Sequence, residues 1–147
     1  MANPWGYFDT SALVKCYVDE PGSLRARALL RRYDFLSSAI TSVELMSALC
    51  RRRRMGELSD ETFTDLISRA REDRLRWELL QVSSAVLDLA EEIIHGTMPI
   101  KTLDAIHVAS LMTFQTASGI KAPFVTADTR QRDAARQVGL DVVWVGR

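Results

Sequence analysis

Short apolar segments alternate with longer segments of helical periodicity along this chain, and this alternation constrains its fold more than any other feature. Five segments have the composition of strands, at residues 5–9, 35–40, 78–82, 122–127 and 141–145. The stretches between them place apolar residues at helical spacing and hold start and stop signals such as Ser59 and Gly139. This pattern is typical of an α/β domain, and it predicts a central, mainly parallel five-stranded sheet flanked by helices.

Hydroxyl residues are the expected caps at the starts of three of the predicted helices. We assign these caps to Thr10 or Ser11, to Thr41 or Ser42, and to Thr102, because a side-chain oxygen there can accept from the free N–H groups of the first turn.

Composition limits the class of protein. The 147 residues suffice for one domain with a sizeable core, and no repeat or linker divides the chain, so we expect a single domain over residues 1–147. Lysine plus arginine and aspartate plus glutamate number 19 each, so any polyanion site must come from local clustering of charge. No apolar run approaches the roughly 18 residues of a membrane span. The first residues lack the pattern of a signal peptide, and Cys16 and Cys50 form no CxxC pair, so we expect a cytoplasmic protein with reduced thiols and no membrane partner.

Four carboxylates stand at the ends of predicted elements. Asp9 ends the first strand, and Asp128 directly follows the strand "FVT". Glu44 and Asp104 lie in the first turns of helices. Because a parallel sheet places its ligands at the carboxyl ends of its strands, we expect the four to converge at one edge. For Glu44 and Asp128, the alternative is a structural role at a helix N-terminus, where the dipole favours acids.

Asp104 is the most informative of these acids, because its segment "TLDAIHVASL" (102–111) is otherwise apolar and is predicted to be largely buried. A buried carboxylate needs compensation, and carboxylates about 5 Å apart repel by roughly 3 kcal/mol per pair. A hard cation, Mg²⁺ or Mn²⁺, would offset this repulsion and suits ligands that are all oxygen. Two separate histidines and no cysteine cluster disfavour zinc.

Four segments in this order resemble the PIN domain, and most of all the VapC toxins of bacterial toxin–antitoxin pairs. They are "YFDTSALVK", "TSVELMSAL", "LDAIHVASL" and "FVTADTRQRDAA", which together extend over almost the whole chain. The resemblance implies a Mg²⁺-dependent ribonuclease whose catalytic, metal-binding residues are the four acids, supported by Thr10, Ser11 and Thr126. It also implies an RNA substrate, a cognate antitoxin that inserts a segment into the site, and a homodimer. Family members differ in which late acids touch metal, so Asp133 is a secondary candidate.

The expected chemistry is hydrolysis of a phosphodiester by metal-activated water, with one or two metal ions. Basic side chains must offset the acids before RNA can approach. The candidates are Arg51, Arg52, Arg53, Arg54, Arg130 and Arg132. For the run 51–54, the alternative is a solvated helix end, where arginines favour the dipole and acidic groups of an antitoxin would bind. His107 shares a helix face with Asp104, and it is either a contact to substrate or carboxylate or a core histidine with a satisfied hydrogen bond.

Other families with an aspartate after the first strand fit less well. A phosphatase of the haloacid-dehalogenase type would need a second aspartate where this chain has Ser11. A phosphoacceptor receiver domain would have a lysine where this chain reads "FVTAD". The remaining alternative is a non-catalytic, RNA- or protein-binding member of the PIN fold. Such a protein would have a damaged acid set, whereas all four acids are present here.

Overall fold

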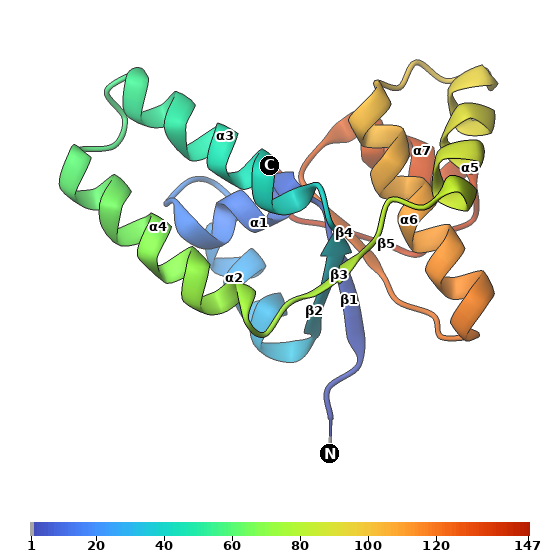
Figure 1. Ribbon diagram of the computed structural model, residues 1–147, viewed down its shortest axis with the longest axis horizontal. Coiled ribbons are helices and arrows are strands. Elements are labelled where there is room, and N and C mark those ends of the chain that lie inside the picture. The colour runs from blue at the N-terminus through green and yellow to red at the C-terminus, as the bar shows by residue number, and fades with distance from the viewer. Residues whose placement is uncertain (1) are drawn as a thin grey trace.

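The computed structural model describes residues 2–147, which form five strands and seven helices (Figure 1). In chain order these elements are β1 (Trp5–Phe8), α1 (Thr10–Tyr17), α2 (Ser23–Arg32), β2 (Asp34–Ser38), α3 (Thr41–Arg54), α4 (Asp60–Arg74), β3 (Glu78–Leu80), α5 (Ser84–His95), α6 (Thr102–Ser118), β4 (Phe124–Thr126), α7 (Thr129–Gln137) and β5 (Val142–Trp144). The predicted alternation of strands and helices is confirmed, and so is the single α/β domain with a five-stranded sheet.

The sheet has the strand order β3-β2-β1-β4-β5, and all four strand pairings are parallel. The first strand is therefore central. Its residue Tyr7 is in register with Leu36 of β2 on one side and with Phe124 of β4 on the other. The chain builds outward from β1 in one direction as far as β3, and then crosses back to add β4 and β5 on the opposite side. The point at which the direction reverses lies between β1 and β4.

Helices cover both faces of the sheet: α1 to α4 pack on one face and α5 to α7 on the other (Figure 1). Successive residues of a strand point to opposite faces, so Phe8 packs with Leu13 and Leu49 on the first side, while Tyr7 packs with Val108 on the second. None of the helices within the described residues combines the length and the apolar character needed to cross a lipid bilayer.

The predicted cap of α1 is wrong. Asp9 itself is the N-cap, and its side chain accepts from the backbone N–H of Ala12. Thr10 and Ser11 are the first two residues of the helix, and their hydroxyls are directed to carboxylates instead. Asp9 lies directly before the helix, so its carboxylate can reach the free N–H groups of the first turn, whereas Thr10 and Ser11 are already part of that turn.

The predicted caps of α3 and α6 are also wrong. Thr41 is already helical, and its hydroxyl bonds with that of Ser37 at 2.6 Å rather than with its own helix. Ser42 also lies inside the first turn of α3. Helix α6 follows Lys101, which forms no side-chain cap, and Thr102 is its first residue.

The segment 102–111 is largely buried, as predicted, except in its first turn. Ala105 to Leu111 are buried, but Leu103 is 45 % exposed and Asp104 is partly exposed. The packing of α6 against α5 begins only at Ala105, which joins a small core with Val86 and Ala90. The first turn of α6 therefore remains accessible, which is what a ligand at Asp104 requires.

Candidate active site

The candidate site lies where the direction of the sheet reverses. Asp9 follows β1, Thr126 ends β4, and Asp128 comes two residues later. Since β1 and β4 are parallel neighbours, these residues share the carboxyl edge of the sheet. In open α/β sheets, ligands bind in the crevice at this reversal of strand order. The expected convergence of strand ends is thus produced by the topology.

Asp9 is fully buried and is held by three donors. Its Oδ1 accepts from the Ser11 hydroxyl at 2.6 Å and from the Ala12 backbone N–H at 2.9 Å, while the Thr126 hydroxyl donates to Oδ2. Burial raises the pKa of Asp9 to about 6, even though these donors and the nearby His107 favour the charged form. The carboxylate is therefore well oriented but costly to ionise, so a bound cation would compensate it strongly.

Glu44, in the first turn of α3, reaches across to two other helices. Its Oε1 accepts from the Thr10 hydroxyl at 2.7 Å and contacts Nε2 of His107 at 2.6 Å. Burial alone would raise the pKa of Glu44, but the bonds from His107 and Thr10 bring it below its usual value. Glu44 is therefore held in its charged form. Its contacts with Thr10 and His107 go beyond the structural role at a helix N-terminus that the sequence left open.

His107 fits both of the descriptions left open by the sequence. It is completely buried, and its Nδ1 lies 2.8 Å from the hydroxyl oxygen of Tyr7. A charged Glu44 can only accept, so Nε2 of His107 donates to it, while Nδ1 is paired with the hydroxyl of Tyr7. His107 is thus a core histidine with both ring nitrogens paired, and it also contacts one of the carboxylates of the site.

Asp104 and Asp128 are joined through one residue of α7. Asp128 caps α7 and accepts from the backbone N–H of Gln131 at 3.0 Å. The side-chain amide of Gln131 donates to Asp104 Oδ1 at 2.9 Å. Burial, followed by the charges of Asp128 and Glu44, raises the pKa of Asp104 above its usual value. Asp128 therefore has the structural role that the sequence left open, as the N-cap of α7, and its charge also acts on Asp104.

The donors at this site are suited to a hard divalent cation. Within residues 2–147, no three His, Cys, Asp or Glu side chains form a ready-made metal cage, because each acid bonds to its own neighbours. Magnesium does not require such a cage, since it keeps several waters and binds through one or two carboxylates. The donors are mostly oxygen, and the mutual repulsion of Asp104 and Asp128 is what a cation relieves. The residues therefore fit a hydrated Mg²⁺ or Mn²⁺ ion.

The three predicted supporting hydroxyls all contact the site. Thr10 donates to Glu44, whereas Ser11 and Thr126 both donate to Asp9. Ser11 also accepts from the Ala127 backbone N–H at 2.9 Å, so it ties the start of α1 to the end of β4.

Asp133 is not brought to the acids by any described contact. Its carboxylate pairs with Arg132 at 2.9 Å, one turn farther along α7. The guanidinium of Arg132 also lies over the ring of Trp144, at 4.8 Å from the ring centre. Arg130 is exposed in the first turn of α7, close in sequence to Asp128.

The arginine run 51–54 forms the last turn of α3, about 10 to 15 Å beyond Glu44 along the helix axis. Arg52 is already paired with Glu20 at 2.6 Å, and Arg53 lies 4.1 Å above the ring centre of Phe63. Arg51, Arg53 and Arg54 are exposed. The run therefore lies apart from the acids on the same side of the sheet as α1 (Figure 1).

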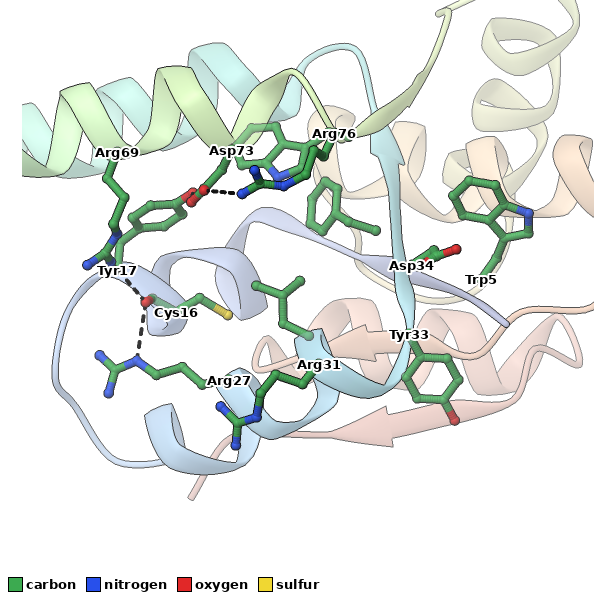
Figure 2. Close-up of a pocket in the computed structure, with 13 residues that line it drawn as sticks. Trp5, Cys16, Tyr17, Arg27, Arg31, Tyr33, Asp34, Arg69, Asp73 and Arg76 are labelled. Atoms are coloured by element: carbon green, nitrogen blue, oxygen red, sulfur yellow. Dashed lines mark hydrogen bonds and ion pairs between the residues drawn. The ribbon is translucent and has the colours of Figure 1, made fainter. Parts of the chain in front are cut away.

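The largest described cavity, of about 680 Å³, is separate from these acids (Figure 2). It lies between α1, α2, α4 and the start of β2, and none of the four acids lines it. Arg27 and Arg69 both donate to the carbonyl of Cys16, at 3.2 and 3.3 Å, and Asp73 accepts from Tyr17. The candidate acids therefore lie at the reversal of the sheet and not in this cavity.

Two site residues were missed by sequence reasoning, Tyr7 and Gln131. Tyr7 is one of several aromatic residues in its strand, and nothing local marks its contact with a histidine 100 positions later. Gln131 did carry a signal, because "DTRQ" (128–131) has the spacing of a capping box. That motif would turn the Gln131 side chain back to its own helix start, whereas the side chain actually reaches Asp104.

Comparison with known proteins agrees with this description. The family model of the PIN domain matches residues 6–137. Ribonuclease VapC46 of Mycobacterium tuberculosis is 36 % identical over 140 residues, which cover 93 % of this chain and 95 % of that protein. Among solved structures, FitAcB from Neisseria gonorrhoeae matches with a TM-score of 0.69 and 21 % identity, over 92 % of this chain and 94 % of that one. A toxin-antitoxin complex from Klebsiella pneumoniae matches with a TM-score of 0.62 and 16 % identity, over 86 % and 88 %. Because both identities are low, these two structural matches show that the fold is shared and carry no statement about activity.

Proposed function

Since this chain belongs to the PIN-domain family, we propose that it is a metal-dependent endoribonuclease and the toxin of a type II toxin–antitoxin pair. The proposal is supported chiefly by the position of Asp9 and Asp128 at the ends of neighbouring strands, and by the charges of Asp128 and Glu44, which lie near enough to Asp104 to raise its pKa. Its relative VapC46 bears the name of a ribonuclease and aligns over nearly the whole chain.

The four acids would hold Mg²⁺, or Mn²⁺ in its place. When bound, such an ion makes a water molecule a better nucleophile and stabilises charge on a phosphate. The chain's own contribution is orientation. Ser11 and Thr126 fix both oxygens of Asp9, and Thr10 and His107 fix one oxygen of Glu44. Carboxylates held in this way lose little conformational entropy when a ligand arrives, which favours binding.

RNA would reach the acids past basic side chains. Arg130, exposed beside Asp128, is well placed for a phosphate near the site, and the partly exposed Arg132 follows two residues later in the same helix. The exposed members of the run 51–54 would contact RNA farther from the acids. Such contacts contribute affinity that depends on salt and not on base sequence.

We also propose that the protein acts in the cytoplasm as a homodimer held by a cognate antitoxin. The fold neighbour from Klebsiella pneumoniae is a toxin-antitoxin complex, which supports an antitoxin partner for this chain. An inserted antitoxin segment would block RNA if it occupied the accessible first turn of α6 at Asp104.

The test is cleavage of total cellular RNA by the purified protein with Mg²⁺, with Mn²⁺ and with a chelator. Wild type should cut only when a metal is present, and Asp104→Asn should not cut at all. Asp88→Asn is the matched control, because Asp88 is an exposed acid of α5, and it should cut like wild type. Metal-independent cleavage, or undiminished cleavage by a folded Asp104→Asn protein, would contradict the proposal. Binding of RNA without cleavage under any metal would favour a non-catalytic member of the fold.

A further inference from the structure

Gln131 is a buried polar residue in the first turn of α7. Only 5 % of its surface is exposed, and its helix neighbours Ala134 and Ala135 are buried apolar residues. An amide is costly to place in such surroundings unless its polar atoms are hydrogen-bonded. The partners of its backbone N–H and of its two side-chain polar groups therefore indicate why an amide stands at this position.

Two of these polar groups bond to two different acids of the site. The backbone N–H donates to Asp128 Oδ1 at 3.0 Å, and the side-chain Nε2 donates to Asp104 Oδ1 at 2.9 Å. Asp104 and Asp128 repel each other, so a link between them opposes their separation. The link is neutral, so it fixes Asp104 without cancelling the negative charge that attracts a cation. An arginine or lysine at this position would do the opposite.

The third polar group, Oε1 of Gln131, is buried and has no hydrogen-bond donor among residues 2–147. The C–O and C–N bonds of an amide are about 1.2 and 1.3 Å long, so Oε1 lies no farther than roughly 5.5 Å from Asp104 Oδ1. Because Oε1 is this close to Asp104 and has no donor of its own, a ligand bound to the Asp104 carboxylate would also be within reach of Oε1. Buried carbonyl-type oxygens are almost always paired, which makes this one an indication of a missing donor.

We propose that Gln131 is a positioning residue of the metal site, in two ways. Its amide N–H holds Asp104 beside Asp128, and its amide oxygen accepts a hydrogen bond from a water molecule in the hydration shell of the bound ion. The inference rests on the metal-binding part of the proposed function, and not on RNA cleavage. Outer partners of this kind orient the ligands of an ion and raise its affinity.

The test is the affinity of the purified protein for Mn²⁺, measured by electron paramagnetic resonance without RNA. Gln131→Met keeps the length of the side chain and removes both its donor and its acceptor, so it should weaken binding by at least about tenfold. The matched control is Gln137→Met, since Gln137 is exposed in the last turn of the same helix, and it should leave binding unchanged.

Circular dichroism and the urea midpoint establish that each variant is folded, and a variant that is not folded is replaced by Gln131→Leu. Unchanged Mn²⁺ affinity in folded Gln131→Met would overturn the inference. If wild type binds Mn²⁺ and Gln131→Met loses it, the inference stands even where no RNA is cut, and only the proposed ribonuclease fails. If wild type binds no Mn²⁺, the inference fails together with the metal site.

Discussion

Replacing Asp9 with Asn should make the folded protein more stable at neutral pH, while removing one acid of the proposed metal site. Asp9 is fully buried, and burial raises its pKa from the usual 3.8 to about 6. An Asn of the same shape can keep its oxygen on the Ala12 N–H and the Ser11 hydroxyl. Its amide can donate to Thr126 Oγ1, which reverses the present bond.

The size of the effect follows from the two pKa values. A carboxyl with a higher pKa in the folded protein takes up a proton on folding, so stability is greatest at low pH and is lost as the pH rises through this range. For Asp9, the difference between 3.8 and about 6 corresponds to about 3 kcal/mol of lost stability at pH 8. About 2 kcal/mol of this loss falls between pH 4.5 and pH 8.

The assay is urea unfolding of wild type and Asp9→Asn at pH 4.5, 6 and 8, in the presence of a chelator. The free energy of unfolding of the variant, relative to wild type, should increase by about 2 kcal/mol from pH 4.5 to pH 8. Asp133→Asn removes a half-exposed acid, and its difference from wild type should vary little over the same range. A difference for Asp9→Asn that is constant or falls with pH would refute the reasoning, because the buried charge would then not be the cause.

Three further outcomes are expected. Tyr7→Phe leaves the buried Nδ1 of His107 without its hydrogen-bond partner, so urea unfolding should show a loss of about 1–3 kcal/mol, and no loss would mean that the bond is replaced. Arg130→Gln should lower the slope of log affinity for single-stranded RNA against log salt by about 0.7, measured with a chelator; an unchanged slope would exclude a phosphate contact. Burial raises the pKa of the Cys16 thiol to about 12, so iodoacetamide at pH 8 should label the partly exposed Cys50 and spare Cys16, as mass spectrometry of peptides can determine.

Features that depend on a few consecutive residues were predictable from the sequence. The apolar run ending at Asp9 and the run "FVT" before Asp128 are local signals, and both are strands in the structure. Parallel topology then brings the two strand ends to one edge without further information. This is why Asp9 and Asp128 could be named in advance as candidates, whereas the supporting hydroxyls of Thr10, Ser11 and Thr126 were named from the resemblance to the PIN domain.

Features that depend on distant partners could not be predicted in this way. Thr41 was assigned as a cap, but a buried Ser37 four residues earlier competes for its hydroxyl. Tyr7 has no local mark, because its polar partner His107 comes from α6. Gln131 has a local mark that points to the wrong partner, since the Asp128 N–H that a capping box would pair with it donates to Thr126 instead, and the Gln131 amide N–H donates to Asp104. Burial by tertiary packing decides each of these cases.

The bond from Thr126 to Asp9 joins residues 117 positions apart, and this separation has a consequence for the growing chain. Strands β1 and β2 can pair early in synthesis, but the other side of β1 stays open until β4 has been made. The acids cannot come together before that moment, so we expect a ribosome making this protein to meet no working nuclease until it has added β4 and Asp128. The open edge of the central strand is meanwhile a site for aggregation. Chains ending before residue 123 should therefore be inert towards RNA and poorly soluble, and a soluble fragment that cuts RNA would show that the site needs less of the chain.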